Sequence, residues 1–485
     1  MLNLPIVYKA LGTLVYLEAL MLALCLGVGL AFGETEWATF GIPVVVAVAV
    51  GFLFRFMGRN AENRMGRRDG FLIVSVTWVV FTLIGMLPLL VGGHQPRLAA
   101  AFFEIMSGFS TTGATAIDDI DALPRSVLLW RSLTHWLGGM GIVFFTIAIL
   151  PNMGGGETKL FAAEATGLKI GKLHPRISTT ARWIWSIYLI LTLGFTAGYY
   201  LCGMGWFDAL NHGLSTIATG GFSTHTASIA YFGSNLIEWI SAAFMFLAGI
   251  NYTLLYVFLI KGRLSFVWGD EELRLYIVLL LATALGGTAI LHYADGLAFT
   301  DALRSSFFNT ISLQSTTGFT DEDFMTWHPT IWLLLTFVSV FGACAGSTSG
   351  GLKLVRLLML VKLVRAEFRQ QLHPHAVLPT RISGTTVTAQ MGRTLMVFFA
   401  VYLCLLFVSI LAMVAMGHTL LDSFGLAISS FSNIGPTLGY EIGPLSSWGS
   451  LSDSCLWLNS FLMLAGRLEI FSLLLPLTPA FWRDE

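Results

Sequence analysis

Charged residues are scarce in this sequence: only 11% of its 485 residues are Asp, Glu, Lys or Arg, whereas soluble domains have about 25%. Hydrophobic residues make up 55% of the chain. So few charges cannot keep the surface of a water-soluble protein of this length hydrated, so most of the surface is expected to contact lipid. The net charge of −1 gives no indication of nucleic-acid binding, which is typical of strongly basic proteins.

Motifs that would indicate an enzyme or a disulfide-stabilised protein are also missing. The five cysteines occur singly, without a CxxC pair, and are expected to pack as small hydrophobic residues. There is no HExxH or GxSxG motif and no pair of intramembrane aspartates, and the glycine-rich segments 154–159 and 167–175 do not fit the phosphate-binding pattern GxxxxGKS or GxxxxGKT. The sequence therefore predicts neither an enzyme nor nucleotide binding by this chain.

Ten apolar runs are each about 20 residues or longer, the length that crosses a bilayer as a helix. They lie near 5–32, 38–57, 70–93, 126–150, 183–203, 236–260, 273–293, 330–360, 394–417 and 455–480. We predict an all-α polytopic membrane protein with about ten spanning helices. If the N-terminus is cytoplasmic, most of the 27 basic residues fall on the inner side, as the positive-inside rule requires, and both termini are predicted to be cytoplasmic.

A short glycine-centred segment recurs four times. It reads STTGAT at 110–115, and similar or looser versions stand at 217–222, 315–320 and 432–437. We align the four segments on Gly113, Gly220, Gly318 and Gly435. Each follows an apolar stretch too short to span a membrane, at 99–109, 207–216, 301–314 and 420–431. Half-length segments at matching places in internal repeats predict re-entrant helices around a shared site.

Such loops have a specific use in a membrane. Extended backbone at membrane depth is tolerated only where it is buried in protein or lines a water-filled cavity. Glycine lets successive carbonyl oxygens point the same way, and four such loops around one axis would form carbonyl rings that replace the hydration shell of a monovalent cation. A re-entrant helix ending at each loop adds the negative end of its dipole. One such triplet is an ordinary turn, but four at equivalent positions predict an ion pore.

These repeats resemble the TrkH/TrkG/KtrB/HKT superfamily of potassium transport proteins from about residue 67 to 480, and the extra N-terminal helices are most similar to its TrkH branch. The resemblance implies four helix–pore-loop–helix repeats around one pore, with one filter glycine per repeat. The implied organisation is an accessory helix pair at 1–66 and pore repeats at 67–160, 177–262, 271–370 and 390–482. The implied potassium filter consists of Thr111, Thr112, Gly113, Ala218, Thr219, Gly220, Thr316, Thr317, Gly318, Asn433, Ile434 and Gly435.

The composition of this filter bears on its selectivity. Glycine at all four aligned positions favours potassium over sodium in the superfamily that the chain resembles. The fourth repeat departs from the others, because Ile434 replaces threonine and Pro436 follows the glycine. Because the four filter segments differ in sequence, the filter is less symmetric than one built from four identical segments. The sequence is therefore compatible with weak as well as strong discrimination against sodium.

The second helix of the third repeat is interrupted at 342–351, GACAGSTSGG. Four glycines and three hydroxyl residues in ten positions do not make a stable helix interior. A flexible packing kink is one interpretation. The resemblance implies another, an intramembrane loop that obstructs the pore, with the gating residues Gly346, Ser347, Thr348, Ser349, Gly350 and Gly351.

Two further groups of charges accompany the pore. Arg467 lies near the middle of the last apolar run, where a charge costs ~2.5–3.5 kcal/mol on insertion scales. The resemblance implies an electrostatic barrier below the filter, and packing against a carboxylate is the alternative. Acidic residues also follow three of the four glycines, and they form either a vestibule that concentrates cations or an ordinary solvated loop. They are Asp118, Asp119, Asp121, Asp321, Glu322, Asp323 and Glu441.

We therefore predict potassium uptake across the bacterial cytoplasmic (inner) membrane by the membrane subunit of a Trk system, with the potassium ion as its ligand. A secondary transporter coupled to protons or sodium is the alternative, but no acidic residue clearly lies at mid-helix on the path. An intramembrane enzyme would need a nucleophile and a base at one depth, and the sequence offers no such set. The resemblance further implies a cytosolic nucleotide-binding regulatory subunit similar to TrkA and a homodimer with one pore per subunit.

Overall fold

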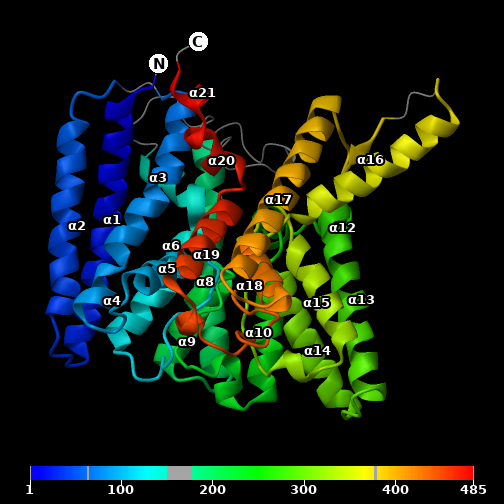
Figure 1. Ribbon diagram of the computed structural model, residues 1–485, viewed down its shortest axis with the longest axis horizontal. Helices are drawn as coiled ribbons and strands as arrows, with labels where there is room; N and C mark the ends of the chain where they lie inside the picture. Colours follow the sequence, from blue (N-terminus) through cyan, green and yellow to red (C-terminus); the bar gives the residue numbers. More distant parts are fainter. Residues whose placement is uncertain (1, 63–64, 150–176, 376–378, 484–485) are drawn as a thin grey trace.

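The computed structural model describes residues 2–62, 65–149, 177–375 and 379–483. Within these ranges the only strands are β1 (Arg381–Ile382) and β2 (Thr385–Thr386), which form one small antiparallel pair; the rest of the regular structure is helical. Both ends of the chain lie at the same end of the helical bundle (Figure 1). The predicted all-α polytopic fold is confirmed. The end of the predicted first repeat and the glycine-rich segments 154–159 and 167–175 lie outside the described residues.

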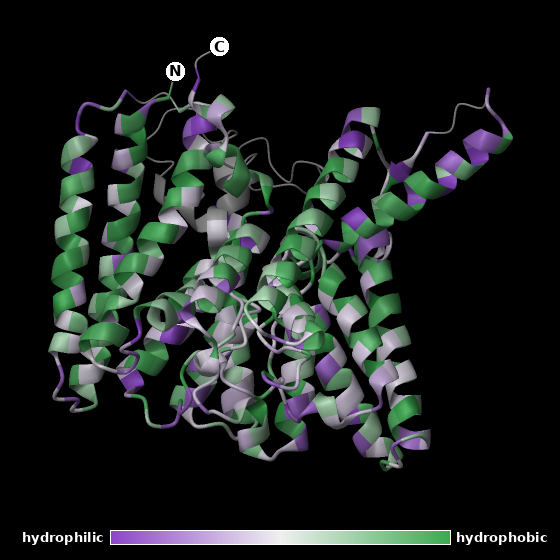
Figure 2. Cartoon of the chain, viewed as in Figure 1, coloured by the Kyte–Doolittle hydropathy of each residue, from purple (hydrophilic) through white to green (hydrophobic). Residues whose placement is uncertain are grey.

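The N-terminal helices α1 (Leu4–Ala31) and α2 (Ala38–Met57) form a hairpin at one side of the bundle (Figure 1). Helix α1 packs against α2 and against the first repeat. Helix α2 has large apolar side chains that face outward, including Val45 and Phe52. Figure 2 shows the same pattern, with hydrophobic residues along the middle of the outer helices and hydrophilic ones mainly at their ends. An apolar outer surface of this kind is expected for helices in lipid.

Four repeats follow, each with a first helix, a short pore helix and a second helix. The first helices are α3 (Arg67–Gly85), α8 (Ile177–Leu201), α13 (Glu271–Tyr293) and α17 (Ala389–Ala415). The pore helices are α5 (Leu98–Phe109), α9 (Trp206–Ile217), α14 (Phe299–Gln314) and α18 (Leu420–Ser432). The shorter helices α4 (Leu87–Val91) and α12 (Leu264–Trp268) connect these elements, and α21 (Pro479–Trp482) follows the second helix of the fourth repeat.

The pore helices are too short to cross a bilayer. They have 12, 12, 16 and 13 residues, which at about 1.5 Å per residue is well below a hydrocarbon core of about 30 Å. They are buried inside the bundle: every residue of α5 except Leu98 is buried. Each therefore enters the protein partway and ends there, as predicted for a re-entrant helix.

All four second helices are interrupted, whereas the sequence indicated an interruption only in the third repeat. Helix α6 (Arg125–Ile149) has non-helical backbone at Gly141. The pair α10 (Asn235–Ala248) and α11 (Tyr252–Lys261) is bent by 102°, and α19 (Asp453–Arg467) with the segment that begins with α20 (Phe471–Leu474) is bent by 113°. In the third repeat, 342–353 separates α15 (Pro329–Phe341) from α16 (Leu354–Leu372).

Because of these interruptions, some of the predicted membrane spans are broken helices. Among the described residues, six helices are long and apolar enough to cross a membrane, and the number of spans is eight if each bent pair counts as one. The predicted runs at 126–150 and 330–360 are the kinked α6 and the divided α15–α16. A glycine at or near each break is the signal that the sequence offered, at Gly141, Gly249, Gly342 and Gly466.

Candidate ion pathway

The four pore helices end in the same unusual backbone geometry. The residue that follows each helical segment has a left-handed conformation, with φ between 51° and 59°, which is strained for the β-branched threonines that occupy three of these positions. The next amide donates to the carbonyl of a serine five residues earlier, at 2.9–3.0 Å in all four repeats. The left-handed residues are Thr111, Thr219, Thr316 and Asn433. Because this backbone geometry occurs once in each repeat, it identifies the equivalent positions of the four repeats independently of residue type.

Two residues further on, four glycines form a closed ring. They are Gly113, Gly221, Gly318 and Gly435, with φ between 79° and 99°. A Cβ atom on each would lie only 1.9–2.7 Å from a carbonyl oxygen of the neighbouring repeat. Those oxygens belong to Gly220, Thr317, Ile434 and Thr112, in that order, so the fourth repeat closes on the first. Both the backbone conformation and the lack of space require glycine here.

The second repeat corrects the predicted register by one residue. Gly221, and not Gly220, is the equivalent of Gly113, and the segment 219–221 replaces the predicted 218–220. Ala218 lies before the left-handed Thr219 and corresponds to Ser110 in the first repeat. The segment IATGGF contains two successive glycines, so matching letters placed the ring glycine one position too early. The end of helix α9 decides the register instead.

A polar side chain behind three of the four ring segments was missed by the sequence analysis. It stands seven residues before the left-handed residue, on the pore helix, and bonds to the chain beyond the glycine. Glu104 accepts from the Ala116 amide at 2.7 Å, and Asn309 Nδ2 donates to Asp321 Oδ1 at 2.6 Å. His212 Nε2 lies 3.0 Å from the Ser223 hydroxyl. The signal was a polar residue at constant spacing within three of the four apolar half-length segments.

The fourth repeat has Leu426 at the equivalent position, so it lacks this polar support. Its pore helix instead packs closely against the segment beyond Gly435: a Cβ on Gly425 would lie 2.2 Å from the Leu438 carbonyl oxygen. The fourth repeat therefore differs from the other three in its pore helix as well as at Ile434 and Pro436.

The interrupting loop at 342–353 lies directly against the ends of the pore helices. The Gly350 amide donates to Thr316 Oγ1 at 2.7 Å, and Thr348 Oγ1 donates to the Ile217 carbonyl at 3.0 Å. A Cβ on Gly350 would be 2.4 Å from the Ser432 carbonyl. The residues predicted to form a gate thus contact the ends of three pore helices, at residues that precede the ring glycines, whereas the acidic residues follow these glycines in the chain.

Several groups hold this loop in place. Buried Glu272, at the start of α13, accepts from the Ala345 amide at 2.6 Å and from the Val355 amide at 3.0 Å, and so clamps both ends of the loop. The Gly346 carbonyl accepts from the Tyr252 amide at 3.0 Å, where α11 begins. In the sequence, Glu272 looks like an ordinary acidic residue in the first turn of a helix, so nothing there indicated this role.

Arg467 joins the loop to two other repeats. Its guanidinium donates to the Thr348 carbonyl at 2.8 Å and to the Gly138 carbonyl of α6 at 2.6 Å. The nearby carboxylate of Glu469 pairs with Arg356 of α16. The predicted loop and the predicted arginine, more than a hundred residues apart in the chain, are therefore in direct contact.

The acidic residues beyond the ring are mostly engaged in local contacts. Asp121 pairs with His225 at 2.6 Å and Glu441 with His418 at 2.9 Å. Asp323 caps a short helix by accepting from the Met325 amide at 2.9 Å. Asp321 accepts from Asn309 and lies three residues past Gly318. Part of the predicted vestibule thus has a structural role, and Asp321 is the carboxyl nearest in sequence to a ring glycine.

With the acidic loops on the outer side, as the positive-inside rule predicts, cation uptake is expected to rise with external pH because of Asp321. Burial and the charge of Glu322 raise the pKa of Asp321 to about 8, although Asn309 donates a hydrogen bond to it. The carboxyl is therefore mostly neutral at pH 7 and becomes a cation-attracting carboxylate above about pH 8. Uptake at low ionic strength, measured from neutral to alkaline pH, should increase severalfold. The increase should be absent in Asp321→Asn, and an equal increase in that variant would contradict the assignment.

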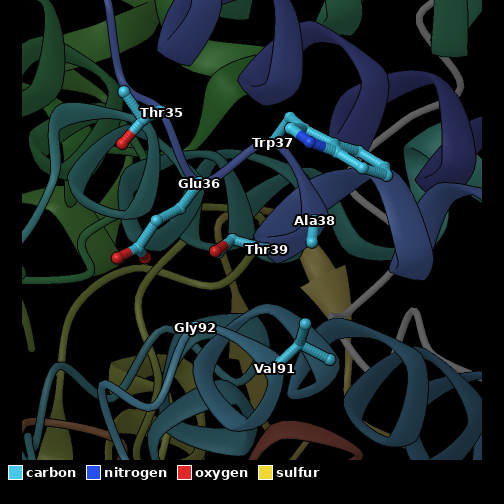
Figure 3. A pocket seen from close by; sticks show the side chains of 7 residues that line it. All are labelled: Thr35, Glu36, Trp37, Ala38, Thr39, Val91 and Gly92. Atoms are coloured by element: carbon cyan, nitrogen blue, oxygen red, sulfur yellow. The ribbon is translucent and has the colours of Figure 1, made fainter.

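A cavity of about 280 Å³ lies elsewhere, between the α1–α2 connection and the end of α4 (Figure 3). It is lined by Thr35, Glu36, Trp37, Ala38, Thr39, Val91 and Gly92. None of these residues belongs to the ring segments or to the loop, so this cavity is separate from the candidate pathway.

Comparison with known proteins agrees with this architecture. The family model for TrkH, described as a cation transport protein, matches residues 38–482. The chain is 36% identical over 483 residues to the Trk system potassium uptake protein TrkH of Halomonas elongata, which covers 99% of this chain and 100% of that protein. It is also 36% identical over 464 residues to TrkH of Escherichia coli, covering 94% and 93% of the two chains.

A solved structure is similar along the whole chain. The crystal structure of the potassium transporter TrkH from Vibrio parahaemolyticus matches with a TM-score of 0.89 and 34% identity, covering 99% of both chains. The relatives are transport proteins, which confirms the prediction that the chain is not an enzyme. Because the family model and relatives above 30% identity cover nearly the entire sequence, the chain belongs to the TrkH family of cation transport proteins.

Proposed function

We propose that this chain is the potassium-translocating membrane subunit of a Trk system in the bacterial cytoplasmic (inner) membrane, with both termini cytoplasmic. The closed ring of Gly113, Gly221, Gly318 and Gly435 at the ends of four half-length helices is the observation that carries the proposal. The potassium uptake activity named for the relatives supports potassium as the transported ion. The potassium ion is then the substrate of the protein and not a resident cofactor.

The filter that we propose consists of four segments, at 111–113, 219–221, 316–318 and 433–435. Their carbonyl oxygens would replace the hydration shell of the ion. The pore helices end at these segments, so the negative ends of their dipoles favour a cation there. The described residues of these segments and of the loop at 342–353 include no acidic side chain, which disfavours the alternative of a transporter coupled to protons or sodium.

The proposed gate is the loop with residues 346–351 together with Arg467. Three contacts support it: Gly350 with Thr316, Thr348 with Ile217, and Arg467 with the Thr348 carbonyl. The loop lies against three pore helices, and a guanidinium beneath a cation filter opposes passage of a second cation. Opening then requires that the loop leave these contacts.

Partners are proposed from the family resemblance. The relatives are named as proteins of a Trk system, which supports an associated regulatory subunit. We propose a cytosolic nucleotide-binding subunit similar to TrkA, which would act on the loop from the side opposite the acidic residues, and a homodimer with one pore per subunit.

Uptake of rubidium into liposomes that contain the purified chain tests the proposed function. We expect uptake that potassium inhibits far better than sodium does. Equal inhibition by the two ions would contradict a potassium filter. If the chain alone gives no uptake, adding the cytosolic subunit decides the outcome, and no uptake in its presence would contradict the proposal.

A further inference from the structure

We infer that the ion pair between Glu104 and Arg131 positions the first and second filter segments relative to each other, and so contributes to cation selectivity. This inference rests on the proposed filter and deepens it, because it names side chains outside the ring that set the geometry of the ring.

The pair is fully buried between the pore helix and the second helix of the first repeat. Arg131 Nε lies 2.9 Å from Glu104 Oε1, and the two side chains are 1% and 0% exposed. Buried charges are costly unless their remaining polar atoms are also paired. The hydrogen-bond partners of the remaining carboxylate and guanidinium atoms therefore show which segments the ion pair positions.

The carboxylate holds the first filter segment. Glu104 accepts from the Thr115 hydroxyl at 3.0 Å and from the Ala116 amide at 2.7 Å. These residues lie two and three positions past Gly113, where the chain leaves the ring. A charged acceptor bonded to the backbone there restricts movement of the segment along and across the pore.

The guanidinium holds the second filter segment. Arg131 donates to the Ser223 carbonyl at 3.1 Å and lies over the Phe222 ring, 4.0 Å from its centroid. These residues are the first and second positions past Gly221. The first and second segments are neighbours in the ring, since Gly113 faces the Gly220 carbonyl. One ion pair thus bridges two adjacent walls of the proposed filter.

Among the described contacts, no other buried ion pair joins two filter segments. His212 and Asn309 hydrogen-bond only within their own repeats, Leu426 is apolar, and the fourth and first segments are joined by a neutral hydrogen bond from Asn433 Nδ2 to Thr112 Oγ1, at 3.1 Å. Binding sites that discriminate between similar ions need ligands held within about 0.5 Å. The spacing between the first two segments is fixed by rigid charged groups, so loss of this pair should change which ion fits before it stops conduction.

A purely structural role is the competing explanation, and selectivity separates the two. We would measure rubidium uptake by the full chain in liposomes, with potassium or sodium as competitor, for the wild type and for Glu104→Gln. The substitution keeps the shape but removes the charge. We expect the potassium-to-sodium preference to fall by about tenfold, the change that roughly 1.4 kcal/mol of discrimination produces, while uptake continues.

The matched control is Glu238→Gln. Glu238 forms a similar Glu–Arg pair with Arg304, at 2.7 Å, but the other ion pair of Arg304 is with Asp301 and not with a filter segment. Its ion preference should equal that of the wild type. A wild-type preference in folded Glu104→Gln would overturn the inference, and so would an equal loss of preference in the control.

A second variant covers the case in which Glu104→Gln does not fold. Arg131→Lys keeps the charge beside Glu104 but lacks the planar fork that reaches the Ser223 carbonyl as well. We expect reduced preference there too, and unchanged preference would overturn the inference. A wild type without any preference for potassium would instead contradict the proposed filter itself, so the two failures are distinguishable.

Discussion

Serine in place of Gly221 is expected to abolish most of the preference for potassium over sodium. Gly221 has φ of 83°, and a Cβ atom there would lie 2.1 Å from the Thr317 carbonyl oxygen. A side chain in the left-handed region costs roughly 1–2 kcal/mol before the clash is counted, so discrimination should fall by about tenfold or more. Gly113→Ser and Gly318→Ser should admit sodium for the same reason. The loss of preference is measured by how strongly sodium inhibits rubidium uptake in each variant.

The neighbouring glycine provides a control for the register. Gly220 lacks the left-handed conformation, but its Cβ would lie 2.2 Å from His135 Nδ1. Threonine occupies the equivalent position in the first and third repeats, so Gly220→Thr should become tolerable once His135→Ala makes room. The same His135→Ala change should not rescue Gly221→Ser. Rescue of Gly221→Ser, or a harmless Gly221→Ser, would contradict the structural register.

Replacing Arg467 by alanine is expected to raise cation flux without changing selectivity. The substitution removes charge-assisted hydrogen bonds to the loop and to α6, each worth about 1.5–3 kcal/mol, and it also removes a positive charge beside the proposed filter. If the loop obstructs the pore, the population of its displaced state should increase by about tenfold or more. Rates of rubidium uptake at fixed protein content test this prediction.

Two controls accompany that measurement. Arg365→Ala removes a basic residue from the exposed part of α16, outside the loop, and should leave the flux unchanged. Thr348→Val keeps the carbonyl that Arg467 contacts but removes the hydrogen bond to Ile217, so a smaller rise in flux is expected. A folded Arg467→Ala protein with equal or lower flux would show that the loop and the arginine do not form the gate.

Local sequence patterns predicted much of this architecture. Apolar runs specify helices that can face lipid, and half-length apolar segments specify helices that end inside the protein, because lipid leaves no other partner for the backbone. The third-repeat loop was also predictable, since four glycines between 342 and 351 destabilise a helix wherever it packs. These features depend on neighbouring residues alone.

Contacts between segments about a hundred residues apart decided the rest. Whether Gly220 or Gly221 enters the ring depends on where α9 ends against the neighbouring repeats, and two adjacent glycines carry no local signal of it. The bridge from Glu104 through Arg131 to Ser223 likewise joins two repeats, and a nearby glycine is the only local signal of the breaks in α6, α10–α11 and α19–α20. Composition and periodicity determined the membrane helices and the four pore segments. Close packing and the need to pair buried polar groups across repeats determined the register and the support of the proposed filter.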